Sequence, residues 1–209
     1  MNKYLKNLIG DYKPSGNLDV DYKSLLMRFE KRHTVEHCSA VAHECERIAL
    51  LFGADSQKAK VAGYFHDISA IIKGADRIEA SEALGIELFE EERALPMITH
   101  QKLSVEIARE VFGIQDMEIL SAIGKHTTLH KEYSVCDLIV FIADKIKWDQ
   151  KNEPPFLGRV MDGLEVSLER AAYEYLDYLL NENPDLKVVH PWARESYEQL
   201  GKVLGMEHI

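Results

Sequence analysis

The chain has 209 residues, of which 46% are apolar and 29% are charged, and its formal net charge at pH 7 is -10. This length and composition fit one large folded domain, or one domain with a modest extension, and exclude an intrinsically disordered protein. The negative charge argues against non-specific binding to nucleic acid or anionic membranes, because both attract basic surfaces. A substrate that carries phosphates would need bound cations to reverse this field locally.

The N-terminus lacks the apolar segment of a signal peptide, and no stretch reaches the roughly 18 apolar residues of a membrane span. We therefore expect a cytoplasmic protein. The chain has three cysteines, and Cys38 and Cys45 lie two turns apart on a predicted helix, on the order of 10 Å along its axis. That separation is too large for a disulfide bond, so we expect reduced, buried thiols.

Apolar residues at helical spacing predict an all-α fold, a helical bundle with extra C-terminal helices. The first long helix is predicted from Thr34 to Phe52, and Ser56 is expected to cap its antiparallel partner. Asp116 and Ser134 are expected to cap two later helices. The other predicted segments are 77–84, 88–94, 102–112, 117–124, 135–143, 157–180 and 192–204.

The same pattern divides the chain into three parts. Residues 1–18 combine a short amphipathic piece with a Pro and Gly break, and we expect an N-terminal arm. Residues 19–155 form the main helical domain. Residues 156–209 are expected to pack on this domain or to extend it, without forming a second domain.

The sharpest local signal is His66 followed by Asp67, at the end of an apolar helix. Adjacent helical residues point about 100° apart, so a metal ion near the helix end can take both as ligands. An isolated His-Asp pair is more often a surface coincidence, and the pair is informative only in context.

Asp144 follows a run of apolar residues, 138–143, and its carboxylate is expected to enter a buried environment. An unpaired buried carboxylate is costly, so it needs a cationic partner. That partner is either a metal ion or a lysine, Lys145 or Lys147. Exposure at the end of the helix is the remaining alternative.

His37 lies at the edge of the apolar stripe of the first long helix and could point into the core. A lone histidine there is more often a satisfied core residue than a metal ligand. His33 competes with it one turn earlier, whereas His43 lies off the stripe and is expected to be solvated.

His100 and His126 are predicted at helix boundaries, from which imidazoles can turn toward a shared cavity. Three further histidines are expected to be structural or on the surface: His130, His190 and His208.

Taken together, the nitrogen and oxygen ligands from separate helices suit two hard or borderline cations. We expect one or two divalent or trivalent ions, iron first, with manganese and zinc as alternatives. The set is His37, His66, Asp67, His100, His126 and Asp144.

This set resembles the HD superfamily of metal-dependent phosphohydrolases, whose pattern is a His, then His-Asp, then a distant Asp on a helical bundle. The chain looks closest to the YqeK family, bacterial HD proteins that hydrolyse diadenosine tetraphosphate symmetrically to two ADP. The matching stretches run in family order from about residue 30 to 150. They include 37–41, 62–67, 100–101, 112–114, 119–123, 126–128 and 142–144.

The chain departs from that family at two places. Ala70 stands where the family commonly has a lysine, and Lys73 would have to substitute for it. After Asp144 the family continues with a Tyr and a Pro-x-Arg element, whereas this chain has Lys145, Lys147 and then Trp148-Asp-Gln150.

The resemblance implies that His37, His66, Asp67 and Asp144 hold one ion while His100 and His126 help to hold the second. Asp67 would bridge the two, His66 and Asp67 would be catalytic, and a metal-bound hydroxide would be the nucleophile. The residues expected to contact the substrate are Lys73, Lys145, Lys147 and Thr127. Each lysine has the alternative of a solvated surface charge.

Two rival functions stay open at this point. The same metal site could serve a phosphatase or phosphodiesterase acting on another nucleotide, because fold does not fix substrate. A non-catalytic module that senses a nucleotide or a metal is the rival from another class. In each case the partner is a small nucleotide, not nucleic acid or a membrane, and a homodimer is compatible with the sequence.

Overall fold

The computed structural model describes residues 1–148 and 152–206, and over these residues it contains helices and no strand. The predicted all-α fold is therefore confirmed. The helices are α1 Lys3–Ile9, α2 Leu18–Arg28, α3 Arg32–Leu51, α4 Ser56–Phe65, α5 Arg77–Ala83, α6 Glu90–Ala94, α7 His100–Glu110, α8 Met117–Lys125, α9 Val135–Ile146, α10 Leu157–Leu164, α11 Leu168–Asp177 and α12 Pro191–Val203.

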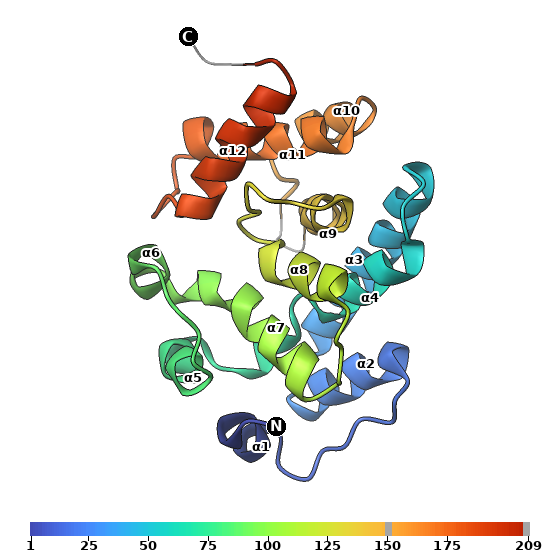
Figure 1. The fold of residues 1–209 in the computed structure, drawn as a ribbon, viewed down its shortest axis with the longest axis vertical. Helices are drawn as coiled ribbons and strands as arrows, with labels where there is room; N and C mark the ends of the chain where they lie inside the picture. The colour runs from blue at the N-terminus through green and yellow to red at the C-terminus, as the bar shows by residue number, and fades with distance from the viewer. Residues whose placement is uncertain (149–151, 207–209) are drawn as a thin grey trace.

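The antiparallel pair α3 and α4 forms one side of the bundle (Figure 1). The two helices approach closely at Gly63, where an added Cβ would lie 2.6 Å from the Cα of Ala42. The predicted cap at Ser56 is wrong by one residue. Asp55 caps α4, because its carboxylate accepts hydrogen bonds from the backbone N–H groups of Gln57 and Lys58.

Helices α8 and α9 pack against this pair, and α7 packs on α8 (Figure 1). The predicted caps are confirmed: the Asp116 carboxylate accepts from the N–H of Glu118, and the Ser134 hydroxyl accepts from the N–H of Asp137. Helix α9 is buried on almost every face, as its apolar sequence predicts. It forms the centre of the bundle.

Helix α1, within the predicted N-terminal arm, packs on the domain. Leu5 and Ile9 of α1 are fully buried in the core. The backbone N–H of Asn2 donates to Glu110, and its side-chain amide donates to the carbonyl of Ala83. The amphipathic piece therefore covers apolar surface near α5 and α7 instead of projecting from the domain.

The C-terminal helices lie at the end of the molecule opposite α1 and α2, with α9 between them (Figure 1). The prediction of one helix over 157–180 is wrong, because the chain breaks between α10 and α11. The Ser167 hydroxyl caps α11 by accepting from the N–H of Arg170. Gly163 lets α10 approach α11 so closely that an added Cβ would lie 2.9 Å from the Cα of Ala171.

Two expectations from composition can be compared with the fold. All three cysteines are free and buried, as expected. Within the described residues, no helix combines the length and the apolar character that a bilayer crossing requires.

Candidate metal centre

Six polar side chains from five helical segments converge near the centre of the bundle. Two of the histidines are the residues that directly follow the last turn of a helix, and a third is the first residue of one. The six are His37 of α3, His66 at the end of α4, the following Asp67, His100 of α7, His126 at the end of α8 and Asp144 of α9.

These residues form two groups that share Asp67, each with its ligand atoms within 4.8 Å of one another. One group consists of His37, His66 and Asp67, and the other of Asp67, His100 and His126. Each group could hold a metal ion. The structure therefore brings together the candidate ligands that the sequence singled out.

Hydrogen bonds to the backbone fix how three of the imidazoles face. The Nδ1–H groups of His66, His100 and His126 donate to the carbonyl oxygens of Gly63, Met97 and Ile123, each three residues earlier. A carbonyl oxygen can only accept, so Nδ1 carries the proton in each ring. The Nε2 atoms consequently present lone pairs to the site, as metal-bound histidines do.

The facing lone pairs of His100 and His126 need a cation between them. Their Nε2 atoms are 2.8 Å apart, whereas Nε2 of His37, whose Nδ1 has no hydrogen-bond partner, is 3.1 Å from that of His66. Two neutral imidazoles that each carry a proton on Nδ1 cannot hydrogen-bond through Nε2. A shared proton or a metal ion resolves the contact, and the donor set fits iron, manganese or zinc.

Asp67 turns one carboxylate oxygen toward each group. Its Oδ2 is 3.7 Å from Nε2 of His66, while its Oδ1 is 3.3 Å from Nε2 of His100 and 3.7 Å from Nε2 of His126. Burial raises the pKa of Asp67, but the three histidines lower it to about 2. The carboxylate is thus ionised at neutral pH and placed to bridge two cations.

Asp144 is oriented by its neighbour in the chain. Lys145 donates to Oδ2 of Asp144 at 2.6 Å and to the carbonyl oxygen of His126 at 3.0 Å. The other oxygen, Oδ1, lies 3.1 Å from Nε2 of His37 and 3.6 Å from Nε2 of His66. Burial raises the pKa of Asp144, but Lys145 and these histidines hold it well below its usual range.

The histidine pKa values differ between the two groups. Burial lowers the pKa of His100 and also, together with the neighbouring His66 and His100, that of His126. Burial also lowers the pKa of His66, but the carboxylates of Asp67 and Asp144 shift it upward overall. Neutral imidazoles are therefore favoured in the second group, and His66 would have to lose any proton on Nε2 to bind a metal ion in the first.

The residues expected to contact the substrate are placed unequally. Thr127 lies at the site, with its hydroxyl 3.1 Å from Nε2 of His100. Lys145 is buried against Asp144, as described. Lys147 pairs with Glu44 at 3.1 Å, and Lys73 is exposed. Among the described residues, no recorded contact joins Lys73 or Lys147 to the metal-ligand candidates, and their expected roles stay predictions.

Arg77 is a charged residue beside the site that sequence reasoning missed. It begins α5, donates through Nη1 to the carbonyl of Met97 at 3.1 Å, and has a buried Nε with no hydrogen-bond partner. Burial lowers the pKa of Arg77, and the charge of Asp67 opposes this shift. The charge of Arg77 in turn contributes to the low pKa of His100. A guanidinium N–H without a partner, next to the two groups of candidate metal ligands, is suited to bind an anionic ligand.

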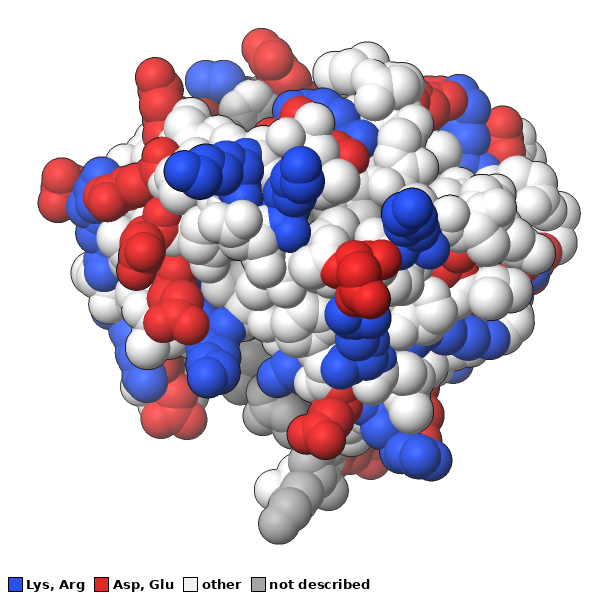
Figure 2. Space-filling model, turned by 90° about the horizontal axis from the view of Figure 1, so that it is seen from below, with Lys and Arg blue, Asp and Glu red and all other residues white. Residues whose placement is uncertain are grey.

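The surface charge on one face of the molecule is mixed. Figure 2 shows that acidic and basic side chains are interspersed on this face instead of forming a broad basic patch. Cations in the site and the charge of Arg77 would attract a phosphate chain locally.

Among the described residues, His43, His130 and His190 belong to neither group. His43 is exposed, as expected, and His130 is half-buried. His190 is buried, its Nδ1 accepts from the N–H of Trp192, and its Nε2 faces Glu92 at 3.5 Å. This is a structural role at the start of α12. His208 lies outside the described residues.

Comparison with known proteins gives a consistent result. The HD domain family model matches residues 34–149, which include all six converging side chains. A solved structure, described as a predicted HD superfamily hydrolase involved in NAD metabolism from Clostridium acetobutylicum, superposes with a TM-score of 0.80 at 25% identity. The match covers 92% of this chain and all of that one.

Two curated relatives illustrate the range of similarity. A Lactococcus lactis subsp. cremoris protein named "Uncharacterized protein in pepC 5'region" is 48% identical over 143 residues, 68% of this chain and 72% of the relative. A protein of Halalkalibacterium halodurans named "Bis(5'-nucleosyl)-tetraphosphatase, symmetrical" is 28% identical over 174 residues, 80% of this chain and 89% of the relative.

Proposed function

Because the chain belongs to the HD domain family, and its paired histidine and aspartate groups fit phosphohydrolase chemistry, we propose that it hydrolyses diadenosine tetraphosphate symmetrically, to two ADP. The observation that carries this proposal is the sharing of Asp67 between two three-residue groups. Two-cation sites of this kind act on phosphate esters and anhydrides. The name of the Halalkalibacterium halodurans relative supports the choice of substrate.

Cations bound in the two groups would activate a water molecule and neutralise the charge that develops on the phosphate oxygens. The protein contributes the geometry of the ligands. Backbone carbonyls accept from the Nδ1–H groups of three histidines, so that each Nε2 faces the site. Lys145 binds one oxygen of Asp144, so that the other oxygen faces His37 and His66.

Arg77 is the residue best placed to bind a phosphate beside the cations. Its free Nε and its charge near Asp67 offer the planar donor that phosphate oxygens accept bidentately. It would also compensate for Ala70, which stands where the related family commonly has a lysine. Thr127 offers a hydroxyl on the opposite side, next to His100.

Product analysis after incubation of the metal-replete protein with diadenosine tetraphosphate tests the proposal. We expect ADP as the product, because attack at a phosphorus flanking the central bridging oxygen yields two ADP. A mixture of AMP and ATP would contradict symmetrical cleavage. Absence of cleavage, with activity on a mononucleotide instead, would favour the rival phosphatase.

Two variants control this experiment. Asp67→Asn removes the shared carboxylate charge and should abolish turnover, because neither group keeps its bridging anion. His43→Ala removes an exposed histidine of α3 and should leave turnover unchanged.

A further inference from the structure

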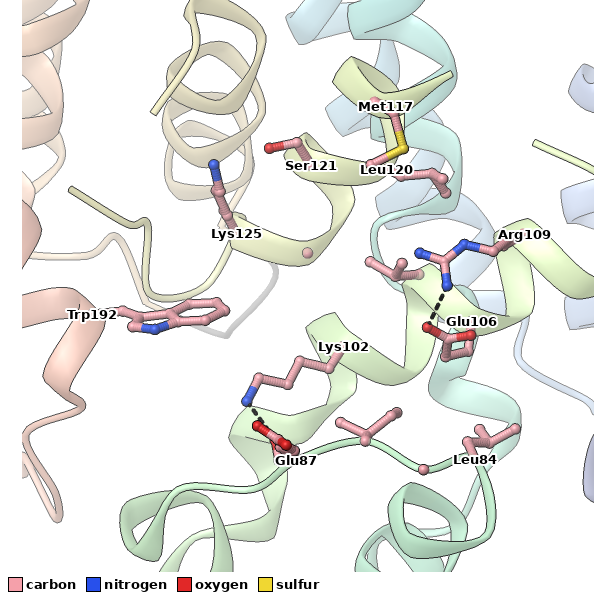
Figure 3. Close-up of a pocket in the computed structure, with 14 residues that line it drawn as sticks. Leu84, Glu87, Lys102, Glu106, Arg109, Met117, Leu120, Ser121, Lys125 and Trp192 are labelled. Atoms are coloured by element: carbon pink, nitrogen blue, oxygen red, sulfur yellow. Dashed lines mark hydrogen bonds and ion pairs between the residues drawn. The ribbon is translucent and has the colours of Figure 1, made fainter. Parts of the chain in front are cut away.

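Two sizeable cavities lie near the metal centre, on different sides of it. The larger, of about 460 Å³, is bounded by α7, α8 and the segment before α6 (Figure 3). Two of its basic side chains already have partners: Lys102 donates to the backbone carbonyl of Glu87 and pairs with Glu92 at 2.8 Å, and Arg109 pairs with Glu106. In the described part of the chain, none of the six metal-ligand candidates lines either cavity. The two cavities differ in whether a lining residue contacts one of these candidates.

The second cavity, of about 360 Å³, lies between the metal-binding bundle and the C-terminal helices. Three segments enclose it: residues 95–98, the pair Thr127 and Thr128, and the C-terminal stretch from Tyr175 to Ala193. Most of its lining is aliphatic, including Leu179 and Val188. Its volume falls within the range of about 300–1,000 Å³ typical of small-molecule sites.

This second cavity shares walls with the metal centre. Thr127 lines the cavity and also places its hydroxyl 3.1 Å from Nε2 of His100. On another side, the ring of Tyr175 lines the cavity with its centroid 5.2 Å from the ammonium of Lys145, which binds Asp144. A ligand whose charged end lies at the metal groups can therefore extend into this space.

We propose that the second cavity receives the nucleoside of the substrate, and that the C-terminal stretch 175–193 thus completes the binding site. This inference rests on the proposed function in that the ligand is a nucleotide. A nucleobase is flat and largely apolar, so an apolar cavity of this size suits it. The aliphatic wall buries the base, while exposed Asp185 and Lys187 at the opening offer polar partners for the ribose.

Filling the cavity tests this assignment. The variants Leu179→Trp and Val188→Trp place a large ring in the second cavity, and Ile86→Trp makes the matched change in the first. We expect each of the first two to weaken ADP binding, measured by calorimetry on the metal-replete protein, by about tenfold or more. Ile86→Trp should bind ADP as the parent protein does.

A second measurement needs no substitution. After photolysis of the intact protein with 8-azido-ADP, the labelled peptide is identified by mass spectrometry. A label within residues 95–98 or 175–190, which line the second cavity, supports the inference. A label within residues 84–87 or 102–125, which line the first, overturns it, as would unchanged ADP affinity in folded Leu179→Trp and Val188→Trp, or absence of ADP binding to the parent protein. ADP binding that depends on this cavity, in a protein that does not cleave diadenosine tetraphosphate, would refute the proposed substrate and leave the cavity assignment standing.

Discussion

At the scale of single residues, the proposed function depends on which partners the oxygens of two carboxylates face. Asp67 gives one oxygen to each histidine group, and Asp144 gives one oxygen to Lys145 and the other to the histidines. Both carboxylates are ionised at neutral pH because cationic partners outweigh the cost of their burial. Buried anions arranged in this way are ready to bind cations.

Arg77 provides a test at this scale. Arg77→Gln removes the guanidinium charge, and we expect KM for the nucleotide substrate to rise by roughly 10- to 100-fold, the worth of a charged hydrogen bond. Metal content should not change, because Arg77 is not a ligand. Arg77→Lys should be intermediate, since a lysine acts only as a point charge.

Steady-state kinetics and elemental analysis on the same preparations provide the readout. Arg93→Gln, on the neighbouring helix α6, removes a surface arginine that pairs with Glu82 and serves as the control. An unchanged KM in Arg77→Gln would show that Arg77 does not bind the phosphates.

The six metal-ligand candidates could be predicted from the sequence, whereas Arg77 could not. Their order along the chain resembles a known family pattern, and each histidine lies at a helix boundary or on an apolar stripe. Arg77 lies ten residues after Asp67, beyond two short 3-10 turns, and no periodicity relates the two. Lys145 was among the predicted partners of Asp144, and the structure shows this pairing, whereas its hydrogen bond to the His126 carbonyl could not be predicted from the sequence.

At the scale of helices, the site depends on how closely α3 and α4 approach. His37 and His66 can meet because Gly63 has no side chain between the two helices. Gly63→Ala would place a Cβ 2.6 Å from the Cα of Ala42, and backbone atoms would have to move apart. We expect this variant to lose about 1–3 kcal/mol of unfolding free energy, measured by chemical denaturation.

Gly158→Ala is the matched control. It also adds a methyl group to a helix, α10, but an added Cβ at Gly158 has no neighbouring atom within 4 Å. Alanine is the better helix former, so this variant should be unchanged or more stable by up to about 1 kcal/mol. Equal unfolding free energies of the two variants would show that the close approach of α3 and α4 does not determine stability.

The errors in the predicted helices have local causes. The long apolar pattern over 157–180 does not reveal the break at Ser167, because helical spacing resumes after the cap. Leu5 and Ile9 also have too short a pattern to show, from sequence, that the first helix is buried. The segment 135–143 was predicted correctly as part of α9 because an uninterrupted run of apolar residues after the cap Ser134 is a strong signal.

At the scale of the whole molecule, the C-terminal helices are joined to the bundle through buried polar contacts. Glu92 of α6 is fully buried, accepts from Lys102 at 2.8 Å and faces His190, the cap of α12, at 3.5 Å. Burial raises the pKa of Glu92, but His190, Lys102 and the N–H of Phe89 bring it below its ordinary value of 4.5.

This contact predicts a pH-dependent contribution to stability. A carboxylate whose pKa is lowered by folding stabilises the protein above its unfolded pKa and loses this contribution as the pH falls through its folded pKa. Glu92→Gln should therefore cost about 1–3 kcal/mol at pH 7, and the difference from the parent protein should shrink below pH 4.5. Denaturation curves across pH 3 to 7, a range chosen to bracket the pKa, would reveal it. A difference that is constant over this range would contradict the assigned ionisation.

The central claim is that the two groups sharing Asp67 hold the cations on which hydrolysis depends. The most direct measurement is to remove metal with a chelator and then add back iron, manganese or zinc. The rate of diadenosine tetraphosphate cleavage is measured as a function of the metal equivalents bound per chain. The two groups predict no turnover without metal and a rise that saturates at about one to two equivalents per chain. Full turnover by protein that elemental analysis shows to be metal-free would contradict the account.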